Sequence, residues 1–169
     1  MRGRVAADNT GHIVRDAISA FDNIVGQFTK QLLNLVPLSK RRAERLGRGR
    51  FHDLIETCDM LQWFDIDLLA GISSGEERFL KRMFLRRHVY EHNGGEVDAI
   101  YLEKSGDTTV RLKQHIAESV EDIHRLLGNL DRMARNLHDG FHELLPSLEG
   151  PIEAQTEKVK RKAFKKGEE

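Results

Sequence analysis

The chain has 169 residues, of which 32% are charged, and its 27 basic and 27 acidic residues give a formal net charge of zero. This length fits a single domain, and the balanced charge excludes a global attraction to nucleic acid or anionic lipid. The lone Cys58 excludes an internal disulfide, and no apolar run approaches the ~20 residues of a membrane span. We therefore expect a soluble cytoplasmic protein in which anion binding comes only from local patches.

The first predicted helix begins at Asn9 or Thr10, either of which can cap it, after eight irregular residues. Apolar residues then recur at three- and four-residue steps to about Leu35, which indicates an amphipathic helix, and Pro37 marks its end. The residues of this apolar stripe are Ile13, Ala17, Phe21, Ile24, Phe28 and Leu32.

Residues 40–50 read KRRAERLGRGR and hold six cations against the single Glu44. Two interpretations stay open: a solvated linker, or a patch that contacts the phosphate backbone of a nucleic acid. In the second interpretation the RNA-binding candidates are Arg41, Arg42, Arg45 and Arg48.

A shorter second helix is predicted over 51–63, followed by a connection over 65–75 with glycines at both ends. We interpret Cys58 and Trp63 as packing residues of this region, with Trp63 in the core rather than serving as a base-stacking platform. Residues 97–102 are brief and apolar on alternate sides, which predicts a packed loop that Tyr101 anchors.

The third predicted helix covers 76–92. Ser73 or Ser74 can cap its start, and the acidic residues at 76 and 77 favour the positive end of the helix dipole. Asn93-Gly94-Gly95 supplies residues that terminate helices. One apolar stripe runs along this helix and consists of Phe79, Leu80, Met83 and Phe84.

A long last helix is predicted from Ser105 or Asp107 to Pro146, with a bend at Gly128. The lysine-rich tail over 149–169 has too few apolar residues to fold alone, and we expect it to be disordered. The chain therefore predicts an all-α fold: a four-helix up-and-down bundle over 9–148 with a flexible basic tail.

Arg87 and His92 stand at the end of the helix predicted for 76–92 and are the main candidates for chemistry. On an ideal helix, residues five apart differ by ~140° around the axis and ~7.5 Å along it. The last turn relaxes and the arginine stem is long, so both side chains can line one cleft. A guanidinium that forks onto phosphate oxygens and an imidazole that titrates near neutral pH suit phosphate chemistry. The alternative is structural: Arg87 pairs with Glu91, and His92 caps the helix.

This segment resembles the HEPN superfamily of helical-bundle domains, whose signature is an arginine, four to six residues and then a histidine. Asn, Asp or His is favoured directly after the arginine, and this chain has Arg87, His88 and His92 in those positions. The longer string RRHVYEHNGGEVDAIYL is similar to a HEPN-type group around its His-Asn-Gly-Gly turn, as are the flanks SAFD at 19–22 and MARNLHDGFHE at 133–143. The resemblance spans about 11–146.

The resemblance implies a metal-independent endoribonuclease that uses no cofactor, in which two copies dimerise and bring two Arg/His pairs into one cleft. The ribose 2′-OH is expected to attack the adjacent phosphorus and to leave a 2′,3′-cyclic phosphate. Arg87 is expected to hold the phosphate, and His92 to take the 2′-OH proton or to protonate the leaving 5′-oxygen. His88 and Asn93 are expected to support the site. Such proteins often act as toxins or defence effectors, with an antitoxin on another chain.

Two other functions stay open. Many HEPN domains are catalytically silent scaffolds, and this chain would then bind a partner such as a nucleotidyltransferase. The third function is a metal-binding helical bundle, because Glu121 and His124 have the step seen in di-iron bundles. Two histidine pairs also have the i,i+4 spacing that places both imidazoles on one helix face, namely His88/His92 and His138/His142.

Overall fold

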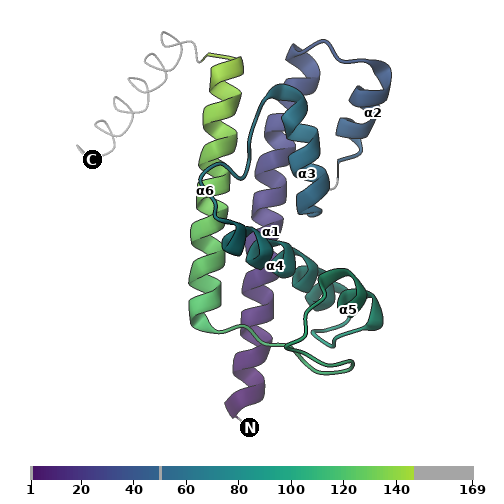
Figure 1. Ribbon diagram of the computed structural model, residues 1–169, viewed down its shortest axis with the longest axis vertical. Helices are drawn as coiled ribbons and strands as arrows, with labels where there is room; N and C mark the ends of the chain where they lie inside the picture. Colours follow the sequence, from purple (N-terminus) through teal and green to yellow (C-terminus); the bar gives the residue numbers. More distant parts are fainter. Residues whose placement is uncertain (1, 50, 147–169) are drawn as a thin grey trace, which may run out of the picture.

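The computed structural model describes residues 2–49 and 51–146 (Figure 1), and over these residues the fold is all-α. The described part contains six α-helices and one 3-10 turn, not the four helices predicted. They are α1 (Arg2–Leu35), α2 (Lys40–Gly47), α3 (Leu54–Leu61), η1 (Gln62–Phe64), α4 (Ser74–His92), α5 (Ala99–Ser105) and α6 (Val120–Leu144). The all-α prediction is confirmed, and the tail predicted for 149–169 lies outside the described residues.

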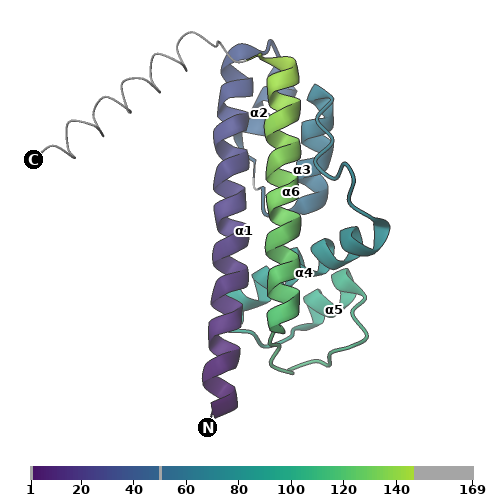
Figure 2. The ribbon, with the colours of Figure 1, turned by 90° about the vertical axis from the view of Figure 1, so that its left-hand side faces the viewer.

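Helices α1 and α6 form the long axis of the molecule and lie side by side in both views (Figures 1 and 2). The rings of Phe28 and Phe141 meet edge to face between them, with 4.9 Å between centroids. The buried stripe of α1 is shifted by one residue from the predicted stripe at four places, since Val14, Ile18, Val25 and Thr29 are buried and only Phe21 and Leu32 are buried as predicted. Val14 and Val25 are fully buried, whereas the neighbouring Ile13 and Ile24 are 44% and 41% exposed.

Helix α4 lies across α1 and α6 rather than along them, and α1 and α6 run in the same direction (Figures 1 and 2). In an up-and-down bundle of four helices each helix reverses the previous one, so the first and last would be antiparallel. That part of the fold prediction is therefore wrong. The physical reason is that the loop after α5 carries the chain back to the end of the molecule at which α1 begins (Figure 1).

Two helices near the N-terminus differ from the prediction. Helix α1 begins at Arg2 rather than at Asn9 or Thr10, because extending an existing helix needs no new nucleus and no proline interrupts the segment. Helix α2 occupies the basic segment that was open to interpretation as a linker. Its Lys, Arg, Ala, Glu and Leu residues are all strong helix formers.

The segment 107–119 is a loop, and α6 begins at Val120 rather than near Ser105 or Asp107. The loop backbone pairs with the segment 95–97. Val97 N–H donates to the Gln114 carbonyl at 2.9 Å, and Ile116 N–H donates to the Gly95 carbonyl at 3.0 Å. These bonds satisfy backbone groups that a helix would pair internally, so no helix forms here.

Side-chain caps set the remaining helix boundaries. Asp98 accepts a hydrogen bond from Tyr101 N–H at 2.7 Å and starts α5 within the predicted loop. Ser119 accepts from Asp122 N–H at 3.0 Å and starts α6. Helix α6 then continues through Gly128 to Leu144 as a single helix.

Candidate functional site

Helix α4 ends where the sequence predicts, and its last turns carry the candidate residues. Ser73 caps its start by accepting a hydrogen bond from Glu76 N–H at 3.3 Å. At the other end, Gly94 and Gly95 have φ values of 58° and 87°, which glycine adopts without steric cost. The chain therefore leaves the helix directly after His92. The predicted stripe of α4 is confirmed as buried, namely Phe79, Leu80, Met83 and Phe84.

The Arg87 side chain is largely shielded from solvent, with 13% of its surface exposed. It forms an ion pair with Glu91 one turn later, with 3.2 Å between Nη2 and Oε2, which is the pairing of the structural alternative. Its Nε atom is buried and has no hydrogen-bond partner among the described residues. An unsatisfied buried donor costs about 1–3 kcal/mol. In this conformation the buried Nε is out of reach of an external acceptor, so a ligand would meet Arg87 through the exposed part of its side chain.

His88 and His92 are both exposed on the last two turns of α4, with their ring centroids 4.4 Å apart. Partial burial lowers the pKa of His88, and the neighbouring His92 lowers it further. His88 is therefore uncharged at neutral pH and its free ring nitrogen can accept a hydrogen bond. Together with Arg87, these residues place one fixed cation and two imidazoles within the end of one helix.

Asn93 is engaged in holding the end of α4 against the start of α5. Its Nδ2 atom donates to Asp98 Oδ2 at 2.6 Å. Hydrogen bonds from the Tyr101 backbone and from Asn93 lower the pKa of Asp98, so this carboxylate remains ionised at neutral pH. Asn93 thereby fixes the turn that follows His92.

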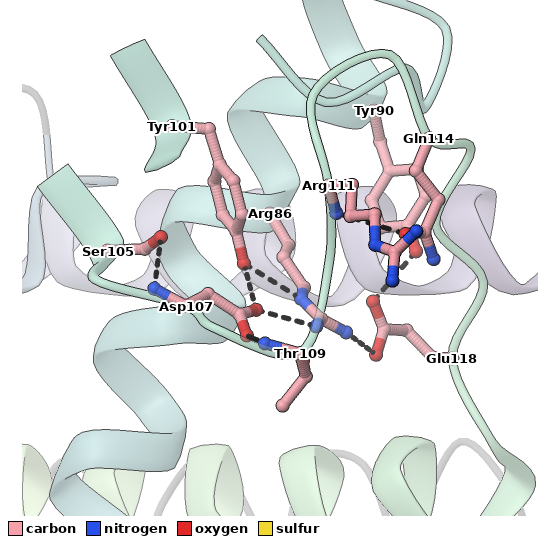
Figure 3. A network of polar contacts seen from close by, with 9 residues as sticks. All are labelled: Arg86, Tyr90, Tyr101, Ser105, Asp107, Thr109, Arg111, Gln114 and Glu118. Carbon is pink, nitrogen blue, oxygen red and sulfur yellow. Dashed lines mark hydrogen bonds and ion pairs between the residues drawn. The ribbon is translucent and has the colours of Figure 1, made fainter. Parts of the chain in front are cut away.

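The buried arginine of α4 is Arg86, which directly precedes the predicted residue (Figure 3). Its Nε atom donates to Tyr101 Oη at 3.0 Å. Its Nη1 atom donates to Glu118 Oε2 at 2.7 Å, and its Nη2 atom donates to Asp107 Oδ2 at 2.8 Å. Both carboxylate side chains are only 1% exposed, so the cation and its partners form a buried ionic cluster. The cluster ties the loop 107–118 to the middle of α4.

Further hydrogen bonds complete this cluster. Asp107 Oδ1 accepts from the backbone and the hydroxyl of Thr109, and Asp107 Oδ2 also accepts from Tyr101 Oη. Burial by itself would raise the pKa of Asp107, but the hydrogen bonds from Thr109, Tyr101 and Arg86 outweigh it and hold this pKa well below its usual range. Asp107 is therefore a carboxylate at every pH near neutrality.

Tyr90 connects the cluster to α1. Its hydroxyl donates to Glu118 Oε1 at 2.7 Å, and its ring lies against Gly11. Burial raises the pKa of Tyr90, and the Glu118 charge raises it further, so the phenol stays protonated and can donate. A Cβ at Gly11 would come within 2.5 Å of the Tyr90 ring, so this close approach of α1 and α4 requires glycine.

Sequence reasoning missed most of the ionic cluster. Asp107 and Glu118 stand 21 and 32 residues from Arg86, and no periodic pattern links residues across such distances. The prediction that Tyr101 anchors its segment is confirmed, since Tyr101 is 3% exposed and bonded to Arg86. The only sequence feature that pointed to Arg86 was the spacing of the apolar residues on α4. This spacing leads to position 86 and to position 87 alike, so it did not show which arginine is buried.

The basic segment places three of its arginines on α2 and Arg48 at the C-terminal cap of this helix. The candidates, all exposed, are Arg41, Arg42, Arg45 and Arg48. The guanidinium carbons of Arg42 and Arg45 lie 5.5 and 5.4 Å from the centroid of the Trp63 ring. Trp63 also packs against the main core, as predicted, but it is only half-buried. Arg45 Nε lies 3.4 Å from Glu56 Oε1 as well.

The second histidine pair lies on α6, with 4.5 Å between the rings of His138 and His142. His138 Nδ1 lies 2.9 Å from Asp139 Oδ1, and His142 Nδ1 lies 3.3 Å from the Leu145 carbonyl. Within the residues that the structure describes, no group of three or more His, Cys, Asp or Glu side chains is placed to hold a metal ion. Zinc sites use three or four protein ligands, so this part of the chain gives the metal-bundle alternative no support.

Comparison with known proteins gives no family assignment. No family model, no curated protein and no solved structure matches the chain significantly. Across 2–49 and 51–146, no helix is both long and apolar enough to cross a membrane. A function therefore has to be argued from the residues at the end of α4 and their surroundings.

Proposed function

We propose that the protein is a metal-independent endoribonuclease with a HEPN-like fold, acting as a cytoplasmic homodimer with Arg87 and His92 at its reaction centre. The observation that supports this best is the grouping of Arg87, His88 and His92 before the Asn-Gly-Gly turn. The two imidazoles are exposed and 4.4 Å apart, and Arg87 directly precedes His88 on the same helix. A fixed cation and two titratable rings suit the binding of a phosphodiester and the transfer of protons.

In the proposed reaction the 2′-oxygen of a ribose attacks the adjacent phosphorus, and the bond from phosphorus to the 5′-oxygen breaks. His92 accepts the 2′-OH proton, and His92 of the partner subunit protonates the leaving 5′-oxygen. Arg87 binds the non-bridging oxygens, where negative charge increases in the transition state. His88, uncharged at neutral pH, accepts a hydrogen bond and positions the ribose. The products are a 2′,3′-cyclic phosphate and a free 5′-hydroxyl.

The ion pair between Arg87 and Glu91 has a consequence for this mechanism. Arg87 has to exchange the Glu91 carboxylate for the substrate phosphate, so Glu91 competes with substrate. Arg87 meets Glu91 at one contact of 3.2 Å, whereas a guanidinium can form two parallel hydrogen bonds to a phosphate. Glu91→Gln should therefore keep or increase cleavage, provided that Arg87 holds the phosphate.

A catalytically silent scaffold that binds a partner protein, such as a nucleotidyltransferase, is the second candidate. It is favoured by one observation: Arg87 is 13% exposed and already paired with Glu91, as expected for a structural residue. RNA cleavage separates the two functions: a silent scaffold cuts no RNA in any variant, whereas the nuclease cuts RNA as the wild type and keeps or increases this activity in Glu91→Gln.

The test compares RNA cleavage by the wild type, Arg87→Ala, His92→Ala and Glu91→Gln. His115→Ala is the matched control, since His115 is exposed and lies on the loop before α6. Loss of the general base or of the cation should slow cleavage by about 10²–10⁴-fold, while far-UV circular dichroism stays unchanged. Wild-type cleavage per folded molecule in the Arg87→Ala and His92→Ala variants would disprove the proposed site.

A further inference from the structure

The helix α2 concentrates positive charge on a chain whose net charge is zero. Its cations are exposed, Glu44 is the one acidic residue of the helix, and Glu56 of α3 pairs with Arg45 at 3.4 Å. Arg41, Arg45 and Arg48 have the spacing i, i+4, i+7, which places them along one side of the helix. Four of the five cations over 40–48 are arginines, whose planar forks match phosphate oxygens better than lysine does.

Trp63 orders two of these arginines before any ligand binds. The guanidinium carbons of Arg42 and Arg45 lie 5.5 and 5.4 Å from its ring centroid, within cation–π distance. A guanidinium held against an aromatic ring keeps its N–H donors at the edge of its plane, where they can bind an anion. Fixing long side chains in advance reduces the entropy lost on binding.

We propose that α2 and Trp63 form an anchoring site for the phosphate backbone of single-stranded RNA, separate from the groups at the end of α4. The choice of RNA as the polyanion rests on the proposed function. It is supported by the exposed guanidinium groups of Arg42 and Arg45, whose planes offer stacking faces to bases that an acidic peptide would not use. Helix α2 and helix α5 lie toward opposite ends of the long axis (Figures 1 and 2), so the anchor acts on binding and not on the chemical step.

The experiment titrates the full chain with a 2′-O-methyl RNA oligonucleotide, which binds but cannot be cleaved through its 2′-oxygen. Trp63 is the only tryptophan, so its emission reports the site directly. RNA binding should change this emission. In Arg42→Gln/Arg45→Gln, the loss of two phosphate contacts should reduce the log–log salt slope by ~1.4 and weaken affinity about 25-fold at 0.1 M salt. The matched control is Arg15→Gln/Arg135→Gln, which removes the same charge from two other surface arginines.

A second double variant keeps the test decisive if the glutamine variant does not fold. Arg42→Lys/Arg45→Lys keeps both charges but not the stacked planes, so it should retain the salt slope and lose most of the Trp63 emission change. An unchanged slope in the glutamine variant together with unchanged Trp63 emission would overturn the anchor. Equal binding of polyglutamate with the same charge would overturn it in favour of an acidic protein partner. If the wild type binds this RNA at α2 but cleaves no RNA, the proposed function fails and the anchor stands.

Discussion

Replacing Arg86 by leucine tests the energetics of the buried ionic cluster. The substitution removes three hydrogen bonds of 2.7–3.0 Å and leaves Asp107 and Glu118 as neighbouring buried carboxylates without their cation. Each carboxylate side chain is 1% exposed, so water cannot replace the guanidinium without opening the loop 107–118. Breaking a buried ion pair by removing one partner costs about 3–5 kcal/mol.

This cost is a large part of the whole stability of a domain, which is about 5–15 kcal/mol. For a chain of this size, we expect the melting temperature of Arg86→Leu to fall by about 6–20 °C. Arg135→Leu is the control, because Arg135 pairs with Asp131 on the exposed side of α6. The control should melt close to the wild type.

The pH dependence adds a second measurement. In the wild type the pKa of Asp107 is below its unfolded value, so the stability that it contributes is fully present above about pH 4 and is lost as the pH falls further. Without Arg86, Asp107 is buried without its cation, which raises its pKa in the folded protein. The difference in unfolding free energy between wild type and Arg86→Leu should therefore be smaller at pH 4 than at pH 7.

Urea titrations followed by far-UV circular dichroism at both pH values give these free energies. The reasoning is refuted if Arg86→Leu unfolds at the same urea concentration as Arg135→Leu. It is also refuted if the difference from the wild type is the same at pH 7 and pH 4. Restoring part of the loss by adding Asp107→Asn and Glu118→Gln would identify the orphaned charges as its cause.

Two further predictions concern packing. Gly11→Ala should destabilise the protein by about 1–3 kcal/mol, because the new Cβ would lie 2.5 Å from the Tyr90 ring. Gly128→Ala should stabilise α6 by up to about 1 kcal/mol, because nothing lies within 4 Å of the added Cβ. Thermal unfolding of the two glycine variants measures both changes in stability. Burial raises the pKa of the Cys58 thiol to about 11, and the carboxylates of Asp67 and Asp59 add to this effect. Alkylation of native Cys58 at pH 7.5 should therefore be roughly 100-fold slower than in urea, and equal rates would contradict its burial.

The local parts of the fold could be predicted from the sequence. The stripe of α4 and its glycine stop follow from spacing and from backbone conformation, and both are found in the structure. Pro37 likewise follows the end of α1 at Leu35. These features depend on residues within one or two helical turns of each other, so the local sequence is sufficient to predict them.

The parts that depend on distant partners could not be predicted. Leu112 and Ile116 are four residues apart, as on one helix face, yet they lie in a loop that pairs with 95–97 and packs on a second small core. Leu112 is 54% exposed, so the apparent stripe was a coincidence of spacing. Two neighbouring apolar residues of one helix are ambiguous because the choice depends on distant partners. Spacing alone cannot decide whether Ile13 or Val14 faces the core.

The candidate site shows the same limit. The sequence brings Arg87, His88 and His92 to one helix end, because their spacing is local. It does not show that Arg86 takes the buried position, since its acidic partners come from the loop after α5. It also does not show that the guanidinium groups of Arg42 and Arg45 lie over the Trp63 ring, which depends on how α2 packs.

The products of RNA cleavage in excess chelator test the central claim most directly. The substrate is an RNA, with a matched strand that carries a single 2′-deoxy residue at the cleaved position. We predict that the RNA is cut without metal and that the deoxy position is not cut. Mass spectrometry should show 2′,3′-cyclic phosphate and 5′-hydroxyl ends on the products. Cleavage that stops in chelator, or that leaves 5′-phosphate ends and also cuts the deoxy position, would contradict a mechanism based on Arg87 and His92.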